Sequence, residues 1–328
     1  MTGTESRIAA FLQAEAPGWA GAQRAPLHPD ASARRYHRLT RPDGASVILM
    51  DAATEPPETL ARFLTVARFL SEARLSAPSV LAADPARGLA LIEDFGTLSL
   101  ADLHRTDPAR ARIAFGEVEA LLDRLACTPV PDWAARPDPA MQADMATLTF
   151  DRLQLPPDRA AAARTALAGA LARHAPGAPV LAMRDVHADN LMWLAHRHGL
   201  ARVGLLDFQD AVALPAGYDL ASLVDDPRRV IAPDWRAALI AAAAERAGVP
   251  HAAMTTRINT LSLLRNLRIL GIFHRLATDA GKPAYARFLP RVAVLLRRAA
   301  ADPDLAGLAP VVEDTLTRAS AWIGAPAA

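Results

Sequence analysis

Three oxygen-bearing side chains in the second half of the chain have the types and the spacing that phosphoryl transfer needs. Asp185 and Asn190 lie five residues apart on one segment, and Asp207 follows farther along. A carboxylate can orient an attacking hydroxyl and take its proton, while amide and carboxylate oxygens hold the cations that neutralise the phosphates. We therefore predict Asp185 as the catalytic base, and Asn190 with Asp207 as ligands of Mg²⁺.

A predicted β-hairpin explains how two of these side chains meet. Residues 191–194 and 201–206 are short apolar runs, and the glycine-containing segment 196–199 predicts a turn between them. Such a hairpin places Asn190 at the mouth of its first strand and Asp207 at the end of its second. The proposed base lies on the loop before the hairpin, which can turn back to the same mouth.

Each of these motifs also has a simpler interpretation. An Asp-x4-Asn spacing alone arises by chance in loops, and an aspartate after an apolar strand is often only a turn former. The two signals at the two ends of one predicted hairpin favour the catalytic interpretation. Arg184 and His187 flank the proposed base as supporting residues. For His187 we favour a hydrogen bond to backbone over proton transfer.

The composition restricts the class of protein. The 328 residues carry a formal net charge of +1 without a basic or acidic block, which argues against nucleic acid or an anionic membrane as the main partner. No apolar run approaches the roughly 18 residues of a membrane helix, and the N-terminal residues lack a signal-peptide pattern. The single Cys127 cannot form an internal disulfide. We expect a cytoplasmic protein, a monomer or weak dimer, that acts on a small molecule.

The order of the predicted elements indicates an α+β fold with two lobes, and the similarity of residues 183–185 and 207–209 to the kinase signatures H-R-D and D-F-G implies that it is protein-kinase-like. Strands dominate residues 1–96, which we predict as an antiparallel-sheet lobe that binds a nucleotide. Residues 97–328 form the predicted catalytic and substrate lobe, which is mainly helical. Its helices are expected over 109–126, 141–153, 158–174, 235–247 and 255–278.

The first lobe offers groups that can bind a nucleotide. Strands are predicted over 36–40 and 46–50, joined by a tight Arg-Pro-Asp-Gly turn. The small, polar segment before them, which includes Ser32, contains no glycine and stands where a kinase-like fold covers the phosphates. A further strand leaves the sheet around Glu93 and Phe95. We expect backbone groups there to hydrogen-bond an adenine edge, because a strand that leaves a sheet exposes unpaired N–H and C=O groups.

The first lobe lacks a lysine for the phosphates. Lys282 is the only lysine in the chain, and Met50 ends the strand on which a kinase-like fold presents one. An active enzyme therefore needs an arginine in this role, and Arg34 or Arg35 is our candidate. The alternative, a solvated arginine pair at a strand edge, stays open.

With these motifs in place, the chain resembles the aminoglycoside phosphotransferase and choline kinase group of protein-kinase-like small-molecule kinases. The segments 183–185 and 207–209 are similar to the kinase signatures H-R-D and D-F-G, with Met183 and Gln209 as departures. Within the group, the resemblance is to bacterial kinases that phosphorylate the anomeric hydroxyl of N-acetylmuramate and N-acetylglucosamine. Three stretches carry it: 30–36, then 187–193 with 206–211, and 266–273 with 281–283.

The resemblance runs over nearly the whole chain and implies ATP with Mg²⁺ and a role in recycling peptidoglycan sugars. It implies that Asp219 supports the catalytic loop. Asp210, Arg265 and Arg268 are candidate substrate contacts. The two arginines favour a substrate with a carboxylate, such as N-acetylmuramate, and an exposed basic stripe on a helix is the alternative.

Two competing functions remain open from the sequence. One is another hydroxyl kinase, acting on an aminoglycoside, choline or homoserine. The other is a nucleotide-binding pseudokinase that serves as a scaffold, which Met183 and the absent lysine favour. The retention of the proposed base and both metal ligands opposes the scaffold, because a scaffold has no physical need for all three.

Overall fold

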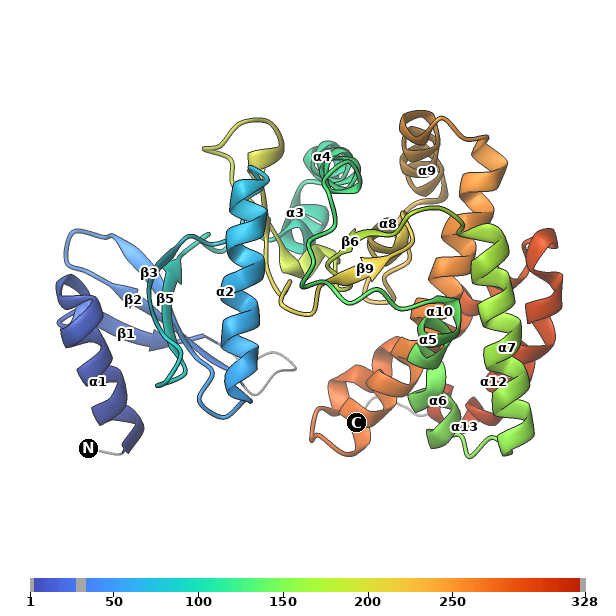
Figure 1. Ribbon diagram of the computed structural model, residues 1–328, viewed down its shortest axis with the longest axis horizontal. Coiled ribbons are helices and arrows are strands. Elements are labelled where there is room, and N and C mark those ends of the chain that lie inside the picture. The colour runs from blue at the N-terminus through green and yellow to red at the C-terminus, as the bar shows by residue number, and fades with distance from the viewer. Residues whose placement is uncertain (1–2, 28–33, 325–328) are drawn as a thin grey trace. The chain divides into compact units, whose positions relative to one another are not determined.

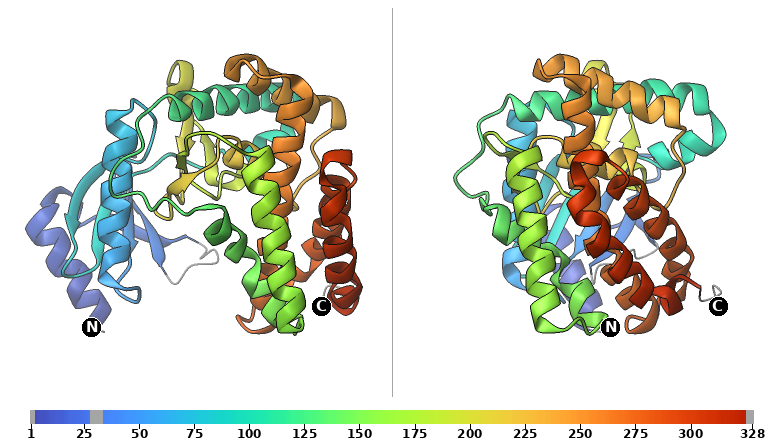
Figure 2. Two further views of the ribbon diagram at one scale, coloured as in Figure 1. Left: turned by 45° about the vertical axis from the view of Figure 1, so that its right-hand side comes forward. Right: turned by 90° about the vertical axis from the view of Figure 1, so that its right-hand side faces the viewer.

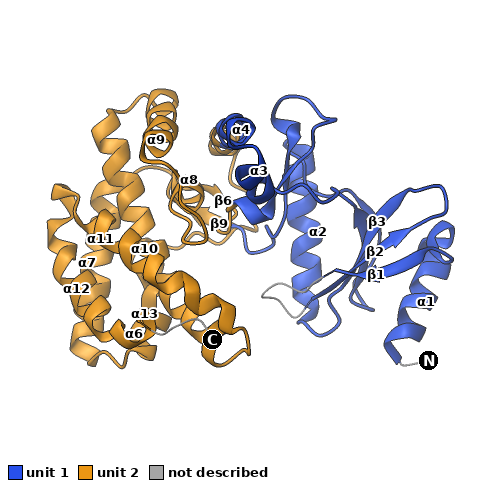
Figure 3. Ribbon diagram, turned by 180° about the vertical axis from the view of Figure 1, so that it is seen from behind, with its two compact units in different colours: residues 1–118, 188–211 blue, residues 119–187, 212–328 orange. Residues whose placement is uncertain are grey.

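A five-stranded antiparallel sheet forms the centre of one of the two units into which the chain divides (Figures 1 and 3). The computed structural model describes residues 3–27 and 34–324. Unit 1 comprises residues 1–118 and 188–211, and unit 2 comprises residues 119–187 and 212–328. Unit 1 therefore continues beyond residue 96, and the lobe boundary placed there stays a prediction.

Hairpins connect most of the sheet of unit 1. Its strand order is β1-β2-β3-β5-β4, and every neighbouring pair is antiparallel. The tight turn between β2 and β3 gives Gly44 a φ of +85°, and the Gly44 N–H donates to the Arg41 carbonyl at 3.0 Å. This conformation costs glycine least. The strands are β1 Gln23–Pro26, β2 Arg35–Thr40, β3 Ser46–Asp51, β4 Val80–Asp84 and β5 Leu89–Glu93.

Two helices cover opposite faces of this sheet, as Figure 1 shows. They are α1 (Gly3–Glu15) and α2 (Pro57–Glu72), which begins with a proline at its first position. Successive residues of a strand point to opposite faces of the sheet. The consecutive buried residues of β3 are therefore explained by a helix on each face. The α1 face consists of Ile8, Phe11 and Leu12, packed with Leu39, Val47, Leu49, Leu89 and Leu91. The buried face of α2 consists of Leu60, Phe63, Val66, Ala67 and Leu70.

The predicted hairpin of the second half of the chain belongs to unit 1. Its strands are β7 (Leu191–Trp193) and β8 (Val203–Leu205), which pair antiparallel. The strands are shorter than predicted because residues Gly199–Arg202 form a 3₁₀ turn instead of the start of β8. Helix α3 (Leu100–Thr106) begins at the Ser99 cap, whose hydroxyl accepts the Asp102 N–H, and α4 (Pro108–Ala126) continues into unit 2.

In the described residues of unit 2, the regular structure is helical apart from one short antiparallel pair of strands, β6 (Val180–Ala182) and β9 (Val212–Leu214). Its long central helix is α10 (His251–Thr278), which packs against α6, α7, α8, α9 and α11 (Figure 2). The other helices are α5 Pro139–Ala143, α6 Thr147–Arg152, α7 Pro157–His174, α8 Tyr218–Val224, α9 Pro233–Ala247, α11 Leu289–Ala300, α12 Ala309–Arg318 and α13 Ser320–Ile323. Further 3₁₀ turns are Pro17–Trp19, Asp144–Ala146, Ala188–Asn190, Pro283–Phe288 and Pro303–Leu308.

Helix α10 is buried on most of its circumference, which explains why its sequence is apolar beyond a single stripe. Its buried residues join a core with α6, α7, α11 and α12 that contains Phe150, Leu167, Leu267, Leu296 and Leu316. Within residues 3–27 and 34–324, none of the helices combines the length and the apolar character that crossing a membrane requires.

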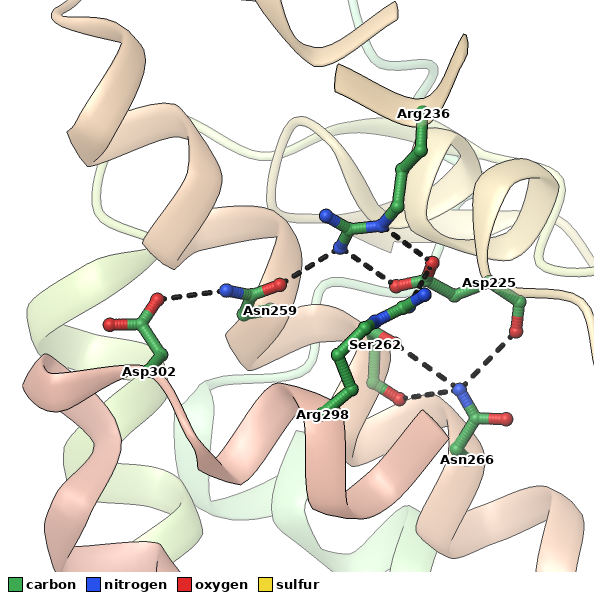
Figure 4. Close-up of polar contacts among 7 residues, drawn as sticks. All are labelled: Asp225, Arg236, Asn259, Ser262, Asn266, Arg298 and Asp302. Carbon is green, nitrogen blue, oxygen red and sulfur yellow. Dashed lines mark hydrogen bonds and ion pairs between the residues drawn. The ribbon is translucent and has the colours of Figure 1, made fainter. Parts of the chain in front are cut away.

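A buried polar network ties four elements of unit 2 together (Figure 4). The fully buried Asp225, just after α8, accepts two hydrogen bonds from Arg236 of α9 at 2.8 and 3.0 Å, and it also pairs with Arg298 of α11. Arg236 continues to Asn259 of α10 at 2.8 Å, and Asn259 donates to Asp302 at 2.8 Å. The carboxylate is thus compensated by two guanidinium groups, which a buried charge requires.

Helices α6 and α10 approach so closely that one position admits only glycine. A Cβ on Gly271 would lie 2.6 Å from the Thr149 hydroxyl and 2.9 Å from its backbone. The Thr149 hydroxyl accepts the Gly271 N–H at 2.9 Å and donates to the Leu267 carbonyl. The backbones of α6 and α10 are therefore in close contact here, and a side chain at position 271 would push them apart.

We expect Gly271→Ala to lower the free energy of unfolding by about 1–3 kcal/mol, because the methyl group overpacks this contact. The loss should occur although alanine is the better helix former by roughly 1 kcal/mol. The matched control is Gly169→Ala on α7, where no atom lies within 4 Å of the position that the new methyl group would take, and it should be neutral or stabilising. Urea unfolding of both variants is the measurement. Equal changes in stability would contradict the packing argument.

Candidate active site

The mouth of the β7–β8 hairpin brings Asn190 and Asp207 together. The Asn190 amide nitrogen lies 3.5 Å from the Asp207 carboxylate, and the Leu206 N–H donates to the Asn190 carbonyl at 2.9 Å. Asp207 has a φ of +56°, a left-handed conformation that side chains rarely adopt, and its carboxylate is 46% exposed. The amide and the carboxylate of these two residues carry oxygen atoms of the kinds that fit a hard cation such as Mg²⁺.

The structure distinguishes the two arginines that were proposed for the phosphates. Arg34 is buried just before β2, with its guanidinium 3.2 Å from the Glu55 carboxylate and 3.4 Å from that of Asp207. Arg35 is exposed on β2. Burial acts against the charge of Arg34, but Tyr36 and the carboxylates of Glu55 and Asp207 hold the pKa of Arg34 above its usual value. Arg34 is therefore the arginine that contacts Asp207, one of the two predicted metal ligands.

A cavity of about 270 Å³ in unit 1 extends from this arginine to the end of the sheet. Arg34, Asn190 and Asp207 line its polar end. Its apolar walls include Ile48, Phe63, Ile92, Met192 and Leu206, and the consecutive residues Glu93, Asp94, Phe95 and Gly96 also line it. Of the predicted nucleotide-binding residues, Arg34, Glu93 and Phe95 line the cavity, Arg35 does not, and Ser32 lies outside the described residues.

In unit 2, a buried carboxylate holds the loop that carries the proposed base. The two oxygens of Asp219, on α8, accept the N–H groups of Met183 and Arg184 at 2.7 and 2.9 Å. Arg184 has a φ of +73°, so these bonds fix a backbone conformation that is costly for an arginine. Burial raises the pKa of Asp219 to about 7, and the two N–H donors act in the opposite direction. Met183, in the place of the expected histidine, is buried in the core.

The proposed base lies beside a cation of α10. A guanidinium nitrogen of Arg268 is 3.8 Å from the Asp185 carboxylate, and the His187 N–H donates to the Asp185 carbonyl at 3.0 Å. Burial acts to raise the pKa of Asp185, but the charges of Arg268 and Arg265 hold it below its ordinary value. Asp185 is therefore kept ionised, which is the form a general base needs.

The three predicted substrate contacts have different surroundings. Arg265 is fully buried within α10, and Arg268 is mostly buried beside the proposed base. Asp210 is exposed on the segment that follows Asp207. Sequence reasoning missed Glu55, whose only signal is an acidic residue in the connection between β3 and α2.

Comparison with known proteins places this arrangement in a family. Residues 24–255 match the phosphotransferase enzyme family, and the chain belongs to it. Among curated proteins, it is similar to the N-acetylmuramate/N-acetylglucosamine kinase of Caulobacter vibrioides, with 36% identity over 93% of this chain and 94% of the relative. The protein of the same name from Pseudomonas aeruginosa is 30% identical over 89% of each chain. The resemblance predicted from the motifs is thus confirmed.

Solved structures confirm the predicted fold class. A choline/ethanolamine kinase family protein from Mesorhizobium loti matches with a TM-score of 0.65 at 18% identity, covering 96% of this chain and 100% of that chain. The GDP complex of an aminoglycoside 2′-phosphotransferase IIIa mutant matches with a TM-score of 0.63 at 12% identity, covering 94% and 99%. The α+β, protein-kinase-like fold follows from these matches and from the sheet and helices described above.

We expect Arg268→Gln to move the acidic limb of the pH–rate profile to higher pH. The base acts only when ionised, so activity falls as the pH drops through the pKa of Asp185, and the Arg268 charge lowers that pKa. Without the Arg268 charge, burial raises the pKa of Asp185 with less opposition. The midpoint of the acidic limb should therefore move up by about one pH unit. Arg275→Gln, at an exposed position of the same helix, should leave the limb in place. The measurement is the turnover rate as a function of pH. An acidic limb at the same pH in Arg268→Gln as in the parent protein would exclude this electrostatic coupling.

Proposed function

We propose that this phosphotransferase is an ATP-dependent kinase of N-acetylmuramate and N-acetylglucosamine that phosphorylates their anomeric hydroxyl and serves the recycling of cell-wall sugars. The observation that carries the kinase chemistry is the meeting of Asn190, Asp207 and Arg34 at one end of the unit 1 cavity. The acceptor is supported by four curated relatives that carry the name N-acetylmuramate/N-acetylglucosamine kinase, led by 36% identity over 93% of this chain.

In this proposal each side chain has one task. Asn190 and Asp207 would hold Mg²⁺, which supplies charge neutralisation for the phosphates when bound. Arg34 adds its guanidinium at the same end of the cavity, where a planar fork suits phosphate oxygens. Asp185 orients the acceptor hydroxyl and takes its proton, and Asp219 keeps the backbone of that loop in place.

We expect Arg34→Met to reduce kcat/KM for ATP by about 10²–10³, because a positioned cation at the phosphates is lost. The matched control is Arg35→Met, one residue along and exposed, which should retain the parental value. Arg34→Lys tests the planar guanidinium, since lysine keeps the charge and loses the planar geometry. Its kcat/KM for ATP should lie between those of the parent protein and Arg34→Met. Steady-state kinetics with ATP as the varied substrate and thermal unfolding of each variant are the measurements. Equal losses for Arg34→Met and Arg35→Met would remove Arg34 from this role.

The acceptor is tested by phosphate transfer to N-acetylmuramate, N-acetylglucosamine, choline and kanamycin, with product NMR to locate the new phosphate. We expect phosphate on the anomeric carbon of the two sugars. Asp185→Asn should reduce this turnover by about 10²–10⁴ while nucleotide binding persists, because only proton acceptance is lost. Asp151→Asn, at an exposed position of α6, is the control for a removed carboxylate.

The possible outcomes separate the hypotheses. Turnover of choline or kanamycin without the sugars would overturn the acceptor and retain the kinase. Nucleotide binding without turnover of any acceptor would favour the scaffold. Full turnover by Asp185→Asn would exclude that residue as the base.

A further inference from the structure

Four consecutive residues that line the unit 1 cavity form what we call the rim segment, residues 93–96. The segment begins with Glu93, the last residue of β5, and continues for three residues beyond the strand. Within the described residues, the structure records no backbone hydrogen bond for the N–H or C=O of Phe95. Such peptide groups can pair with the edge of a nucleobase, but only if the segment is held at a fixed place.

Arg197, in the loop of the β7–β8 hairpin, binds the first residue of the rim segment. Its guanidinium pairs with one oxygen of Glu93, and Ser79 donates its hydroxyl to the other oxygen at 3.0 Å. The same guanidinium donates to the Ser76 hydroxyl at 2.8 Å. Ser76 is itself bonded to the hairpin, because its carbonyl accepts the Leu205 N–H at 2.7 Å. Arg197 therefore connects the rim segment to the hairpin through charged hydrogen bonds.

Phe95 fills a space on the hairpin that a missing side chain leaves open. A Cβ on Gly204, in the middle of β8, would lie 2.7 and 2.8 Å from two carbon atoms of the Phe95 ring. The Arg197 guanidinium also lies over this ring, 5.3 Å from the ring centroid. The backbone of Gly204 does not have a positive φ, so the need for glycine here is one of space.

The sheet holds the rim segment independently at its other end. Arg38 of β2 donates two hydrogen bonds to the Asp94 carboxylate, at 2.6 and 3.0 Å, and a third to the Gly96 carbonyl at 3.0 Å. The segment is thus fixed between β2 and the hairpin. Arg197 lies in the loop at one end of the hairpin. Asn190, before β7, and Asp207, after β8, lie at the other end.

We propose that Arg197 and Gly204 are positioning residues for the phosphoryl donor, and that they set its affinity by holding the rim segment at a fixed distance from the metal-ligand pair. The base and the phosphates of a nucleotide are a limited distance apart. Both can be bound at once only if the protein holds their two binding sites at a matching distance. This inference rests on the proposed function, because it assigns the unit 1 cavity to the donor nucleotide.

The test uses Gly204→Ala and Arg197→Gln in the full-length protein, with ADP binding measured by calorimetry. Both variants should weaken ADP binding by about 10-fold to 100-fold, because the rim segment shifts. The KM for the sugar acceptor should not change. Inhibition by inorganic triphosphate, which uses only the phosphate end, should be retained. The matched controls are Gly116→Ala on α4, where no atom outside its own helix lies within 4 Å of the new methyl position, and Arg87→Gln, an exposed arginine in the turn between β4 and β5 that pairs with Asp84.

A compensating change separates positioning from loss of fold. Phe95→Leu in the Gly204→Ala background makes room for the methyl group and should recover part of the ADP affinity. If the parent protein does not bind ADP, the proposed function fails and this inference fails with it. If the parent binds ADP and both variants bind as tightly as the controls, the inference alone is overturned. Equal weakening of ADP and triphosphate also overturns it, because the effect is then not confined to the base end.

Discussion

The register of the β7–β8 hairpin is the constraint on which the candidate active site depends. Leu191 pairs with Leu205, so Asn190, just before β7, and Asp207, two residues after β8, emerge at the same end. All six strand residues are buried. A slip of one residue would turn each buried side chain to the other face, which makes the register costly to change. Packing in the hairpin therefore holds the backbones of Asn190 and Asp207 close together.

Backbone strain marks the two loops that carry the proposed chemistry. Arg184 and Asp207 both have left-handed φ values, each at a cost of roughly 1–2 kcal/mol. In each loop, polar contacts maintain the conformation. The buried Asp219 accepts the N–H of Arg184, and the Asp207 carboxylate accepts a hydrogen bond from Gln209 at 2.8 Å besides its contact with Arg34. Gln209, in the place of the glycine of the kinase signature, thus gains a contact that glycine could not make.

Local patterns in the sequence predicted the elements, and long-range contacts decided what the patterns left open. The Pro-Asp-Gly turn and the apolar runs indicated the two hairpins, because turn chemistry and period-2 burial act between neighbours. The Glu93–Arg197 pair joins residues 104 positions apart, and no local signal marks it. The same holds for the glycine that accommodates Phe95, which looks in the sequence like any strand glycine. The buried network around Asp225 depends on four elements that meet only after folding.

The choice between Arg34 and Arg35 shows what alternation along a strand can and cannot decide. Period 2 requires that two successive residues point to opposite sides, so one of the pair faces the cavity. Which one does so depends on the covering of the sheet, and the sequence before β2 gives no apolar pattern that would reveal it. The structure settles the orientation through burial, since Arg34 is only 6% exposed.

Strand pairing also explains how an arginine can stand in for the missing lysine. In β3 the terminal apolar residue is Met50, which is fully buried and pairs with Tyr36 of β2. Adjacent strands lie only about 4.8 Å apart, so a long side chain at the start of β2 reaches the space that a side chain at the end of β3 would occupy. Arg34 stands two residues before Tyr36 and contacts both Glu55 and Asp207. A guanidinium binds two such groups at once, where a lysine provides a single point charge. The absence of a lysine on β3 therefore does not argue for a scaffold, because the cation that it would supply is present at the polar end of the cavity.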